Sequence, residues 1–248
     1  MAMKVAVIGA QGRMGHAISA GIESTDGLEL VARLDAGDDI TAESLNGAEV
    51  AVEFTRPDAT LGNVLACIDA GVHCVVGTTG WTDESLAQVK ERLAGTPGTG
   101  VIIAPNYALS AVLAMAFAAR AAAYFESAEV IELHHPNKVD APSGTAMTTA
   151  KHIAQARRDA GMGAMPDATE TDPHGARGAD IDGVRVHAVR LRGLTAHEEI
   201  VFGNPGEQLT IRTDSFDRAS FYPGVLLAIR EVANRPGLTY GLDRIMDL

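Results

Sequence analysis

The chain has 248 residues, 46% of them hydrophobic, enough for one large domain or two small ones with buried cores. Its formal net charge of -12 argues against a general surface for nucleic acid or anionic membranes, because both would repel it. Neither cysteine has the spacing of a metal or redox motif, and Met1–Lys4 lead straight into a strand without a signal peptide. We therefore expect a cytoplasmic protein with reduced thiols.

The first expected element is the apolar strand Val5–Ile8, which leads into a glycine-rich turn and a helix. The spacing is Gly-x-x-Gly-x-x-Gly, whereas the commoner dinucleotide fingerprint is Gly-x-Gly-x-x-Gly. A second strand, Leu28–Leu34, ends at Asp35, where an acid would meet the adenine ribose hydroxyls. An ordinary glycine-rich turn with an incidental acid is the alternative. With Asp35, the candidate cofactor-binding residues here are Gly9, Ala10, Gln11, Gly12, Arg13 and Met14.

Strands and helices then alternate, which predicts a parallel sheet with helices on both faces. Strands are expected at Glu49–Phe54, His73–Val76 and Val101–Ala104, and helices at Pro57–Asp69 and Asp83–Leu93. Ligands of such sheets bind beyond the carboxyl ends of the strands, so the loops there should line one crevice with the glycine turn. Plain turns are the alternative for each loop. The candidates in these loops are Gly77, Thr78, Thr79, Ala104, Pro105, Asn106 and Tyr107.

The second half of the chain predicts an α+β domain with an open mixed sheet. Ala108–Phe125 is alanine-rich and interrupted by an arginine, so we interpret it as a buried helix. A strand at Glu129–His135, a helix at Thr145–Ala160, an exposed loop at Gly161–Gly183 and antiparallel strands at Val184–Leu191, Glu198–Phe202 and Gln208–Thr213 should follow. A last helix is expected at about Tyr222–Val232. The expected fold is therefore α/β, with a Rossmann-type domain at 1–106 and 217–248 and the α+β domain at 107–216.

The passage Glu132–Ala146 joins a strand, a loop and an expected helix N-terminus, and it contains two histidines and a lysine. Ser143 is suited to cap the helix, which leaves backbone amides free to face an anion in the loop. His134 and His135 are adjacent in a strand and should point to opposite faces, so they cannot readily chelate one metal. The pattern indicates a site that binds an acid and moves a proton. Surface or core histidines beside an ordinary turn are the alternative.

Four motifs, in this order and spacing, resemble those of the dihydrodipicolinate reductase family, whose members are also called 4-hydroxy-tetrahydrodipicolinate reductases. They are Gly-Ala-Gln-Gly-Arg-Met-Gly, Val-Val-Gly-Thr-Thr-Gly, Ala-Pro-Asn-Tyr and Glu-Leu-His-His-Pro-Asn-Lys-Val-Asp-Ala-Pro-Ser-Gly-Thr-Ala. The resemblance covers essentially the whole chain; the last motif is highly specific, whereas the glycine turn occurs in many folds. Tyr107 stands where phenylalanine is common, and Gln11 where shorter actinobacterial-type sequences often have lysine.

The resemblance implies a cytoplasmic homotetramer that reduces a cyclic dicarboxylate, 4-hydroxy-tetrahydrodipicolinate, to tetrahydrodipicolinate with loss of water. This reaction lies on the diaminopimelate route to lysine. The resemblance also implies His134 and Lys138 as the catalytic proton donors, with Lys138 in a mixed, partly electrostatic role. By the same correspondence His135, Lys138, Gly144 and Thr145 hold the substrate carboxylates. We interpret Asp140 and Ser143 as residues that shape the loop, and Arg218 as a candidate for a cofactor or substrate contact.

NADH is the expected cofactor, with NADPH also used. Asp35 would repel the 2′-phosphate of NADPH, while Arg13 and Arg33 would offset that repulsion. Two other functions remain open at this point: another Rossmann-type enzyme, such as a semialdehyde or homoserine dehydrogenase, and a non-enzymatic NAD-binding sensor. An acylating semialdehyde enzyme needs an activated cysteine, but Cys67 falls in an expected helix and Cys74 in an expected strand. A sensor would not need the histidine–lysine loop.

Overall fold

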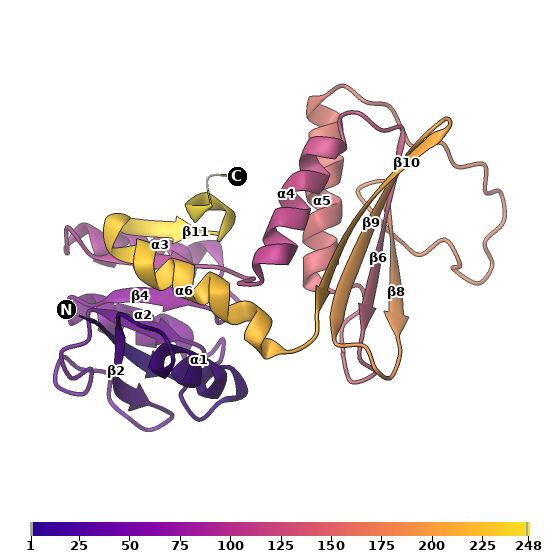
Figure 1. Cartoon of the computed structure of the whole chain (residues 1–248). Helices are drawn as coiled ribbons and strands as arrows, with labels where there is room; N and C mark the ends of the chain where they lie inside the picture. Colours follow the sequence, from indigo (N-terminus) through magenta and orange to yellow (C-terminus); the bar gives the residue numbers. More distant parts are fainter. Residues whose placement is uncertain (1, 247) are drawn as a thin grey trace. The chain divides into compact units, whose positions relative to one another are not determined.

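The computed structural model describes residues 2–246 and 248, and the chain divides into two compact units (Figure 1). Unit 1 comprises Met1–Ala108 and Arg218–Leu248, and unit 2 comprises Leu109–Asp217. The first division lies two residues later than the expected domain boundary, and the second one residue later. Tyr107, which we expected in the second domain, therefore belongs to unit 1.

Unit 1 is a six-stranded parallel sheet covered by helices on both faces. Its strands follow the order β11-β5-β4-β3-β1-β2. They are β1 (Met3–Ile8), β2 (Leu28–Leu34), β3 (Val50–Glu53), β4 (His73–Val76), β5 (Gly100–Ile103) and β11 (Gly237–Tyr240). The order changes direction between β1 and β3, and ligands of open α/β sheets bind at such a point. The fold therefore places a binding crevice at the carboxyl ends of β1 and β3.

The helices of unit 1 are α1 (Arg13–Glu23), α2 (Thr60–Asp69), α3 (Asp83–Ala94) and α6 (Tyr222–Glu231). Helices α2 and α3 share one core cluster with the sheet, whereas α1 and α6 contact each other and cover the other face. Because both faces are covered, β3 and β5 are buried at every residue. Continuous apolar runs in the sequence follow from this burial.

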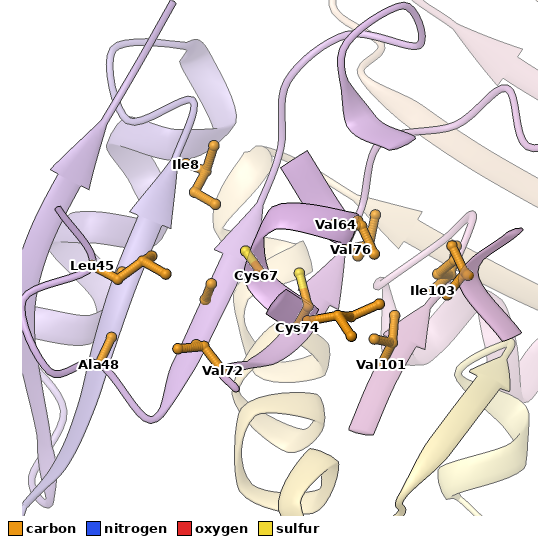
Figure 2. Close-up of a cluster of buried hydrophobic side chains, with 14 of the residues drawn as sticks. Ile8, Leu45, Ala48, Val64, Cys67, Val72, Cys74, Val76, Val101 and Ile103 are labelled. Carbon is orange, nitrogen blue, oxygen red and sulfur yellow. The ribbon is translucent and has the colours of Figure 1, made fainter. Parts of the chain in front are cut away.

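Both cysteines lie in the core of unit 1. Figure 2 shows Cys67 of α2 and Cys74 of β4 among Val64, Val76 and other apolar side chains. Both are free thiols and fully buried. A hydrogen bond with Cys67 and burial raise the pKa of the Cys74 thiol well above its ordinary value. A thiol of this kind is not an activated nucleophile.

Unit 2 has a five-stranded mixed sheet in the order β10-β9-β6-β8-β7. Its elements are α4 (Leu109–Ala121), β6 (Ser127–His134), α5 (Gly144–Asp159), β7 (Ala179–Ile181), β8 (Val184–Arg190), β9 (Ala196–Asn204) and β10 (Glu207–Ser215). Helices α4 and α5 pack together on one face, around Ala118, Ile153 and Phe202 (Figure 1). Half-exposed Ile131, Leu133 and Val201 alternate with buried residues on β6 and β9, so they lie on the opposite face.

The expected elements differ from the structure in four places. The three late strands do not form one antiparallel group, because β6 lies between β9 and β8 and runs parallel to β8. The expected loop Gly161–Gly183 contains the short edge strand β7, and the C-terminal segment contains β11. Helix α2 begins at Thr60 and not at Pro57. No helix in the described residues is long and apolar enough to span a membrane.

Candidate active site

The glycine turn lies between β1 and α1, at the point where the strand order changes direction. Gly9 has φ +85°, and a Cβ there would lie 2.2 Å from the Phe54 carbonyl oxygen. A Cβ on Gly15 would lie 2.0 Å from the carbonyl oxygen of Gly9, so both positions require glycine. Helix α1 begins after Gly12, which provides no side-chain cap, and its first turn has no acidic residue. This helix N-terminus is therefore suited to a phosphate group.

Asp35 follows β2 and lies beside the glycine turn. Its Oδ2 accepts a hydrogen bond from the Gln11 amide at 2.7 Å, and its Oδ1 accepts one from the Ala36 amide at 2.8 Å. A cavity of about 310 Å³ adjoins this carboxylate. The lining residues are Ala10, Gln11, His16, Ser19, Ala20, Glu23, Arg33, Leu34, Asp35 and Asp38. Arg33 pairs with Glu23 inside this group, so the arginine is partly neutralised.

A second cavity, of about 330 Å³, lies on the other side of the turn. It is lined by Gly12, Arg13, Met14, Phe54, Thr55, Pro57, Gly77, Thr78 and Thr79. Arg13 belongs to this cavity and not to the cavity beside Asp35. The buried Thr78 hydroxyl accepts a hydrogen bond from the Thr55 amide at 2.7 Å, which joins the loops after β3 and β4. A Cβ on Gly77 would lie 2.0 Å from the Phe54 ring, so only glycine allows this approach.

Glu53, at the end of β3, holds the loop after this strand in place through hydrogen bonds. The sequence alone indicated no role for this residue. Its fully buried carboxylate accepts hydrogen bonds from Thr60 Oγ1 at 2.7 Å, Asn63 Nδ2 at 3.1 Å and the Thr55 hydroxyl. The Thr60 and Asn63 groups come from α2, so the helix and the cavity loop share one acceptor. A lone glutamate in an otherwise apolar strand was the available signal.

The loop after β5 lies outside the linings of the two cavities described above. Ala104 and Tyr107 are buried and Pro105 is exposed, and none of the four expected residues lines those two cavities. The Tyr107 hydroxyl donates to the Val76 carbonyl at 2.9 Å, and its ring contacts Phe54 with centroids 5.7 Å apart. The tyrosine therefore supports the ring that borders Gly77. Asn106 Oδ1 accepts from the Ala108 amide at 2.9 Å.

The expected substrate loop leads from β6 to α5, and a fully buried carboxylate organises it. Glu132 accepts hydrogen bonds from His134 Nδ1 at 2.6 Å and from the Ser143 amide at 3.0 Å. The Arg190 guanidinium of β8 donates to both Glu132 oxygens, at 2.6 and 2.7 Å, and also to the Asp140 carbonyl at 2.7 Å. Strand, loop and helix thus meet at one carboxylate. Sequence reasoning assigned no role to Glu132 or Arg190.

The charges of this cluster are set by burial and by pairing. Burial raises the pKa of Glu132, but hydrogen bonds from Arg190 and His134 outweigh it, so the net pKa is below its ordinary value. Burial lowers the pKa of His134, and the Glu132 carboxylate offsets only part of this. Neutral His134 then carries its proton on Nδ1, facing Glu132, which leaves Nε2 for a reacting group.

The other expected substrate residues lie around the same loop. Lys138 Nζ donates to Asp140 Oδ1 at 2.7 Å, and this contact holds the pKa of Asp140 below its usual value. His135 is exposed and lies just after the end of β6, so it is not part of the strand in which it was expected. Ser143 Oγ accepts from the Ala146 amide at 3.1 Å and caps α5, while Gly144 is exposed in the first turn. Positive charge and a helix N-terminus therefore occur together.

Three further features involve residues outside the linings of the two cavities described above. Arg218 is exposed at the start of a short 3₁₀ helix, Arg218–Phe221, in unit 1. A cavity of about 450 Å³ in unit 2 lies near the start of β6 and the end of α5. Acidic and basic side chains occur in its lining in equal number. Arg157 borders it and donates to the carbonyls of Phe125, Glu126 and Gly163, which is a structural role. The described residues contain no group of three or more metal-binding side chains.

A parallel sheet with a glycine turn at its change of direction, and an acid after the second strand, defines a nicotinamide-dinucleotide oxidoreductase fold. The sequence profile of the N-terminal part of dihydrodipicolinate reductase matches residues 3–107, and that of the C-terminal part matches residues 110–246. The chain belongs to the dihydrodipicolinate reductase family. Its activity is that of a 4-hydroxy-tetrahydrodipicolinate reductase, an NAD(P)H-dependent enzyme of the diaminopimelate route to lysine.

Relatives of known name agree with this assignment. The 4-hydroxy-tetrahydrodipicolinate reductases of Beutenbergia cavernae and Corynebacterium diphtheriae are 63% and 59% identical to the chain, with all of both chains covered. The solved structure of a dipicolinate-bound dihydrodipicolinate reductase from Paenisporosarcina sp. TG-14 is 38% identical, with a TM-score of 0.89 over 99% of this chain and 100% of its own. An amine dehydrogenase of Mycobacterium smegmatis, 14% identical with a TM-score of 0.63 over 98% of this chain and 95% of its own, shares the fold alone.

Proposed function

We propose that the loop between β6 and α5 binds the two carboxylates of 4-hydroxy-tetrahydrodipicolinate and delivers the proton that the reduction needs. The observation that carries this proposal is the Glu132 cluster, which holds His134 beside Lys138 and the first turn of α5. One substrate carboxylate would bind at the N-terminus of α5, at Gly144 and Thr145, where the positive end of the helix dipole faces the loop. The other would compete with Asp140 for Lys138, with His135 at the rim.

His134 is the proposed proton donor, and Lys138 stabilises the negative charge that develops on the substrate ring. When bound, the nicotinamide supplies the hydride. Because Glu132 engages Nδ1, a proton can leave His134 only through Nε2. Glu132 keeps its charge and stabilises the histidine in its protonated form. The Paenisporosarcina reductase is bound to dipicolinate, a related cyclic dicarboxylate, which supports an anion site in this family.

We further propose that unit 1 holds the dinucleotide, with NADH preferred over NADPH. The pyrophosphate would lie at the N-terminus of α1, and the adenine ribose would meet Asp35 in the cavity of about 310 Å³. Three carboxylates, those of Glu23, Asp35 and Asp38, line this cavity beside Arg33. The excess of negative charge disfavours the 2′-phosphate of NADPH. The residues of the second cavity remain our candidates for the nicotinamide end.

A homotetramer in the cytoplasm is the proposed state of the protein. The support is the half-exposed apolar side chains of Ile131, Leu133 and Val201, on the face of the unit 2 sheet that α4 and α5 do not cover. Closed symmetric assembly is the usual way to bury such a face. A biosynthetic activity and two reduced, buried cysteines suit the cytoplasm.

Alanine substitution at His134 and at Lys138 tests the proposed chemistry. Each variant should lower turnover by about 10²–10⁴-fold, the usual contribution of general acid catalysis, while the Kd for NADH stays unchanged. His152→Ala and Lys151→Ala are matched controls, because this exposed pair lies on α5 beyond its first turn. Near-normal turnover in His134→Ala or Lys138→Ala would show that the residue concerned is not catalytic.

A further inference from the structure

Glu198 of β9 is a buried carboxyl group that the reaction described above does not use. Its exposed fraction is 5%, and it faces α5 from the middle of the sheet. Its Oε1 lies 2.6 Å from the hydroxyl of Thr149 on α5. Its Oε2 is buried without a hydrogen-bond partner among the described residues. An ionised carboxylate in such a place would lack the donors that a buried charge requires.

The contacts of Thr149 fit a protonated Glu198. The Thr149 Oγ1 lies 2.6 Å from Glu198 Oε1 and 3.1 Å from the Thr145 carbonyl oxygen. The hydroxyl has one proton, and a carbonyl can only accept. If Glu198 is protonated and donates to Thr149, the hydroxyl proton remains for the Thr145 carbonyl, and each contact has its own proton. The short Oγ1–Oε1 distance suits such an O–H···O bond.

The groups around Glu198 also favour the neutral acid. Glu132 lies directly opposite on β6, and Thr213 lies opposite on β10 with its hydroxyl bonded to Ser110 of α4. Among these facing groups there is no cation, and Arg190 and His134 are already paired with Glu132. Burial, with the charge of Glu132 added, raises the pKa of Glu198 to about 7, although a Thr149 hydroxyl that donated to the ionised form would act in the opposite direction.

We propose that Glu198 is a positioning residue that acts as a neutral carboxylic acid, linking β9 through Thr149 to the first turn of α5, and that its ionisation weakens substrate binding. The second half of this statement rests on the proposed substrate site at Gly144 and Thr145. On ionisation the Thr149 hydroxyl must donate to Glu198, so its hydrogen bond to the Thr145 carbonyl is lost. A second buried negative charge also appears beside Glu132, behind the amides that would receive a substrate carboxylate.

Thermal unfolding without substrate tests the protonation state alone. A carboxyl whose folded pKa is about 7 and whose unfolded pKa is lower stabilises the protein fully below the unfolded pKa. This stability is lost as pH rises through the folded pKa. Glu198→Gln keeps a neutral donor at every pH, so its Tm relative to wild type should rise between about pH 5 and about pH 8.5. A Tm difference that does not change with pH would overturn the proposal.

Carbon-13 NMR of the wild-type glutamate carboxyl groups gives a second measurement that needs no variant. One carboxyl should titrate at about 7, well above the ordinary range for glutamate. If every glutamate carboxyl titrates in its ordinary range, the proposal is wrong even where Glu198→Gln fails to fold. Should the variant fold, its spectrum should lack the high-pH titration, which assigns it.

Steady-state kinetics tests the link to the substrate. The wild-type KM for the dicarboxylate should rise by roughly threefold to tenfold as Glu198 ionises, the size expected for one added charge at an effective dielectric constant of about 20. In Glu198→Gln this rise should be absent, with kcat at acid pH near the wild-type value. Glu207→Gln is the matched control, since it removes an exposed carboxylate of the same sheet and should keep the wild-type KM profile.

The outcomes separate this inference from the proposed substrate site. A pH-dependent Tm difference together with an unchanged KM rise in Glu198→Gln would overturn the link between Glu198 and substrate binding. If His135→Ala and Lys138→Ala left KM at the wild-type value, the substrate site would be misplaced, while the Tm and NMR results on Glu198 would stand. Loss of the KM rise in Glu198→Gln, with the expected Tm and NMR results, supports the full proposal.

Discussion

Glu132 controls the charge of His134 through a single hydrogen bond of 2.6 Å. Burial lowers the pKa of His134, and the Glu132 carboxylate is the main group that raises it. If protonated His134 is the acid, turnover must fall as pH rises through its pKa. By raising that pKa, Glu132 would then extend the working range to higher pH.

Substitution of Glu132 by glutamine gives a prediction with a definite sign. Without the carboxylate, burial and the nearby Arg190 both disfavour charged His134, so its pKa falls further. The alkaline decline of kcat should move to lower pH, as measured in a pH series with saturating substrates. Glu129→Gln is a matched control, because Glu129 pairs with an arginine and a histidine, Arg177 and His187, on the other face of β6. If the alkaline decline of kcat occurs at the same pH in Glu132→Gln as in the wild type, His134 is not the titrating acid.

We expect the preference for NADH over NADPH to depend on the charged side chains around Asp35. We expect NADH to exceed NADPH in kcat/KM by about tenfold or less, which corresponds to about 1.4 kcal/mol. Asp35→Asn removes the charge but keeps an acceptor for the Gln11 amide, so it should narrow the gap. Arg33→Ala leaves Glu23 unpaired in the same cavity and should widen it. Arg13 lines the other cavity, so Arg13→Ala should affect both cofactors alike.

The test is kcat/KM for both cofactors in wild type and the three variants at one ionic strength, because salt weakens such pairings. A strong wild-type preference for NADPH, or an Asp35→Asn variant with an unchanged ratio, would contradict the role of this acid. The sequence alone predicts that both arginines offset Asp35. The structure distinguishes the expected effects of the two arginines, because Arg33 and Arg13 line different cavities beside the glycine turn.

At the scale of single residues, the sequence predicted groups that stand next to each other in the chain. His134, Lys138 and Ser143 lie within one short passage, and the structure keeps them together. Arg190 lies 58 residues beyond Glu132, and Glu198 reaches Thr149 across 49 residues. These contacts depend on the pairing of β6 with β8 and β9, which local patterns do not specify.

At the scale of elements, the glycine turn gives a stability prediction. Gly15→Ala would place a Cβ 2.0 Å from the Gly9 carbonyl oxygen, so α1 must shift away from β1. We expect a loss of about 1–3 kcal/mol in the free energy of unfolding, the range for overpacking, and weaker NADH binding. Denaturant unfolding and a binding titration would measure both.

Gly62→Ala is the matched control for this substitution. Gly62 is exposed in α2, and a Cβ there has no neighbour within 4 Å. Alanine should stabilise this helix by about 0.5–1 kcal/mol and leave NADH binding unchanged. If Gly15→Ala behaved in the same way, the close approach of α1 to the turn would not matter for the site.

Strands with clear turn residues on both sides were predicted well, and the short edge strands β7 and β11 were not. Strands β2 and β4 have the expected bounds, because their apolar runs are flanked by turn residues. Strand β7 has three residues and joins β8 through Asp182 and Gly183, both with positive φ. An Asp-Gly pair before a strand is a hairpin signal that could have revealed it. Strand β11 has four residues at the sheet edge, directly after Pro236, and gave no comparable pattern.

At the scale of the whole molecule, assembly is the main prediction. Light scattering should give the mass of a homotetramer, and Val201→Asp should lower that mass by placing a charge on the open face of the unit 2 sheet. Tyr124→Asp is the control, because its side chain is exposed beyond the end of α4. An active monomer at low concentration would contradict the tetramer.

Unit 2 is continuous in the chain, whereas unit 1 is completed by a segment that follows it. Strand β11 pairs with β5, and α6 packs Val225 and Ile229 into the core of unit 1. During synthesis the first 108 residues therefore leave the ribosome without their edge strand and without one covering helix. Unit 2 has all its strands well before the last residues are translated. The dinucleotide fold should thus mature last, and a transcript truncated after unit 2 would yield a chain unable to retain its cofactor.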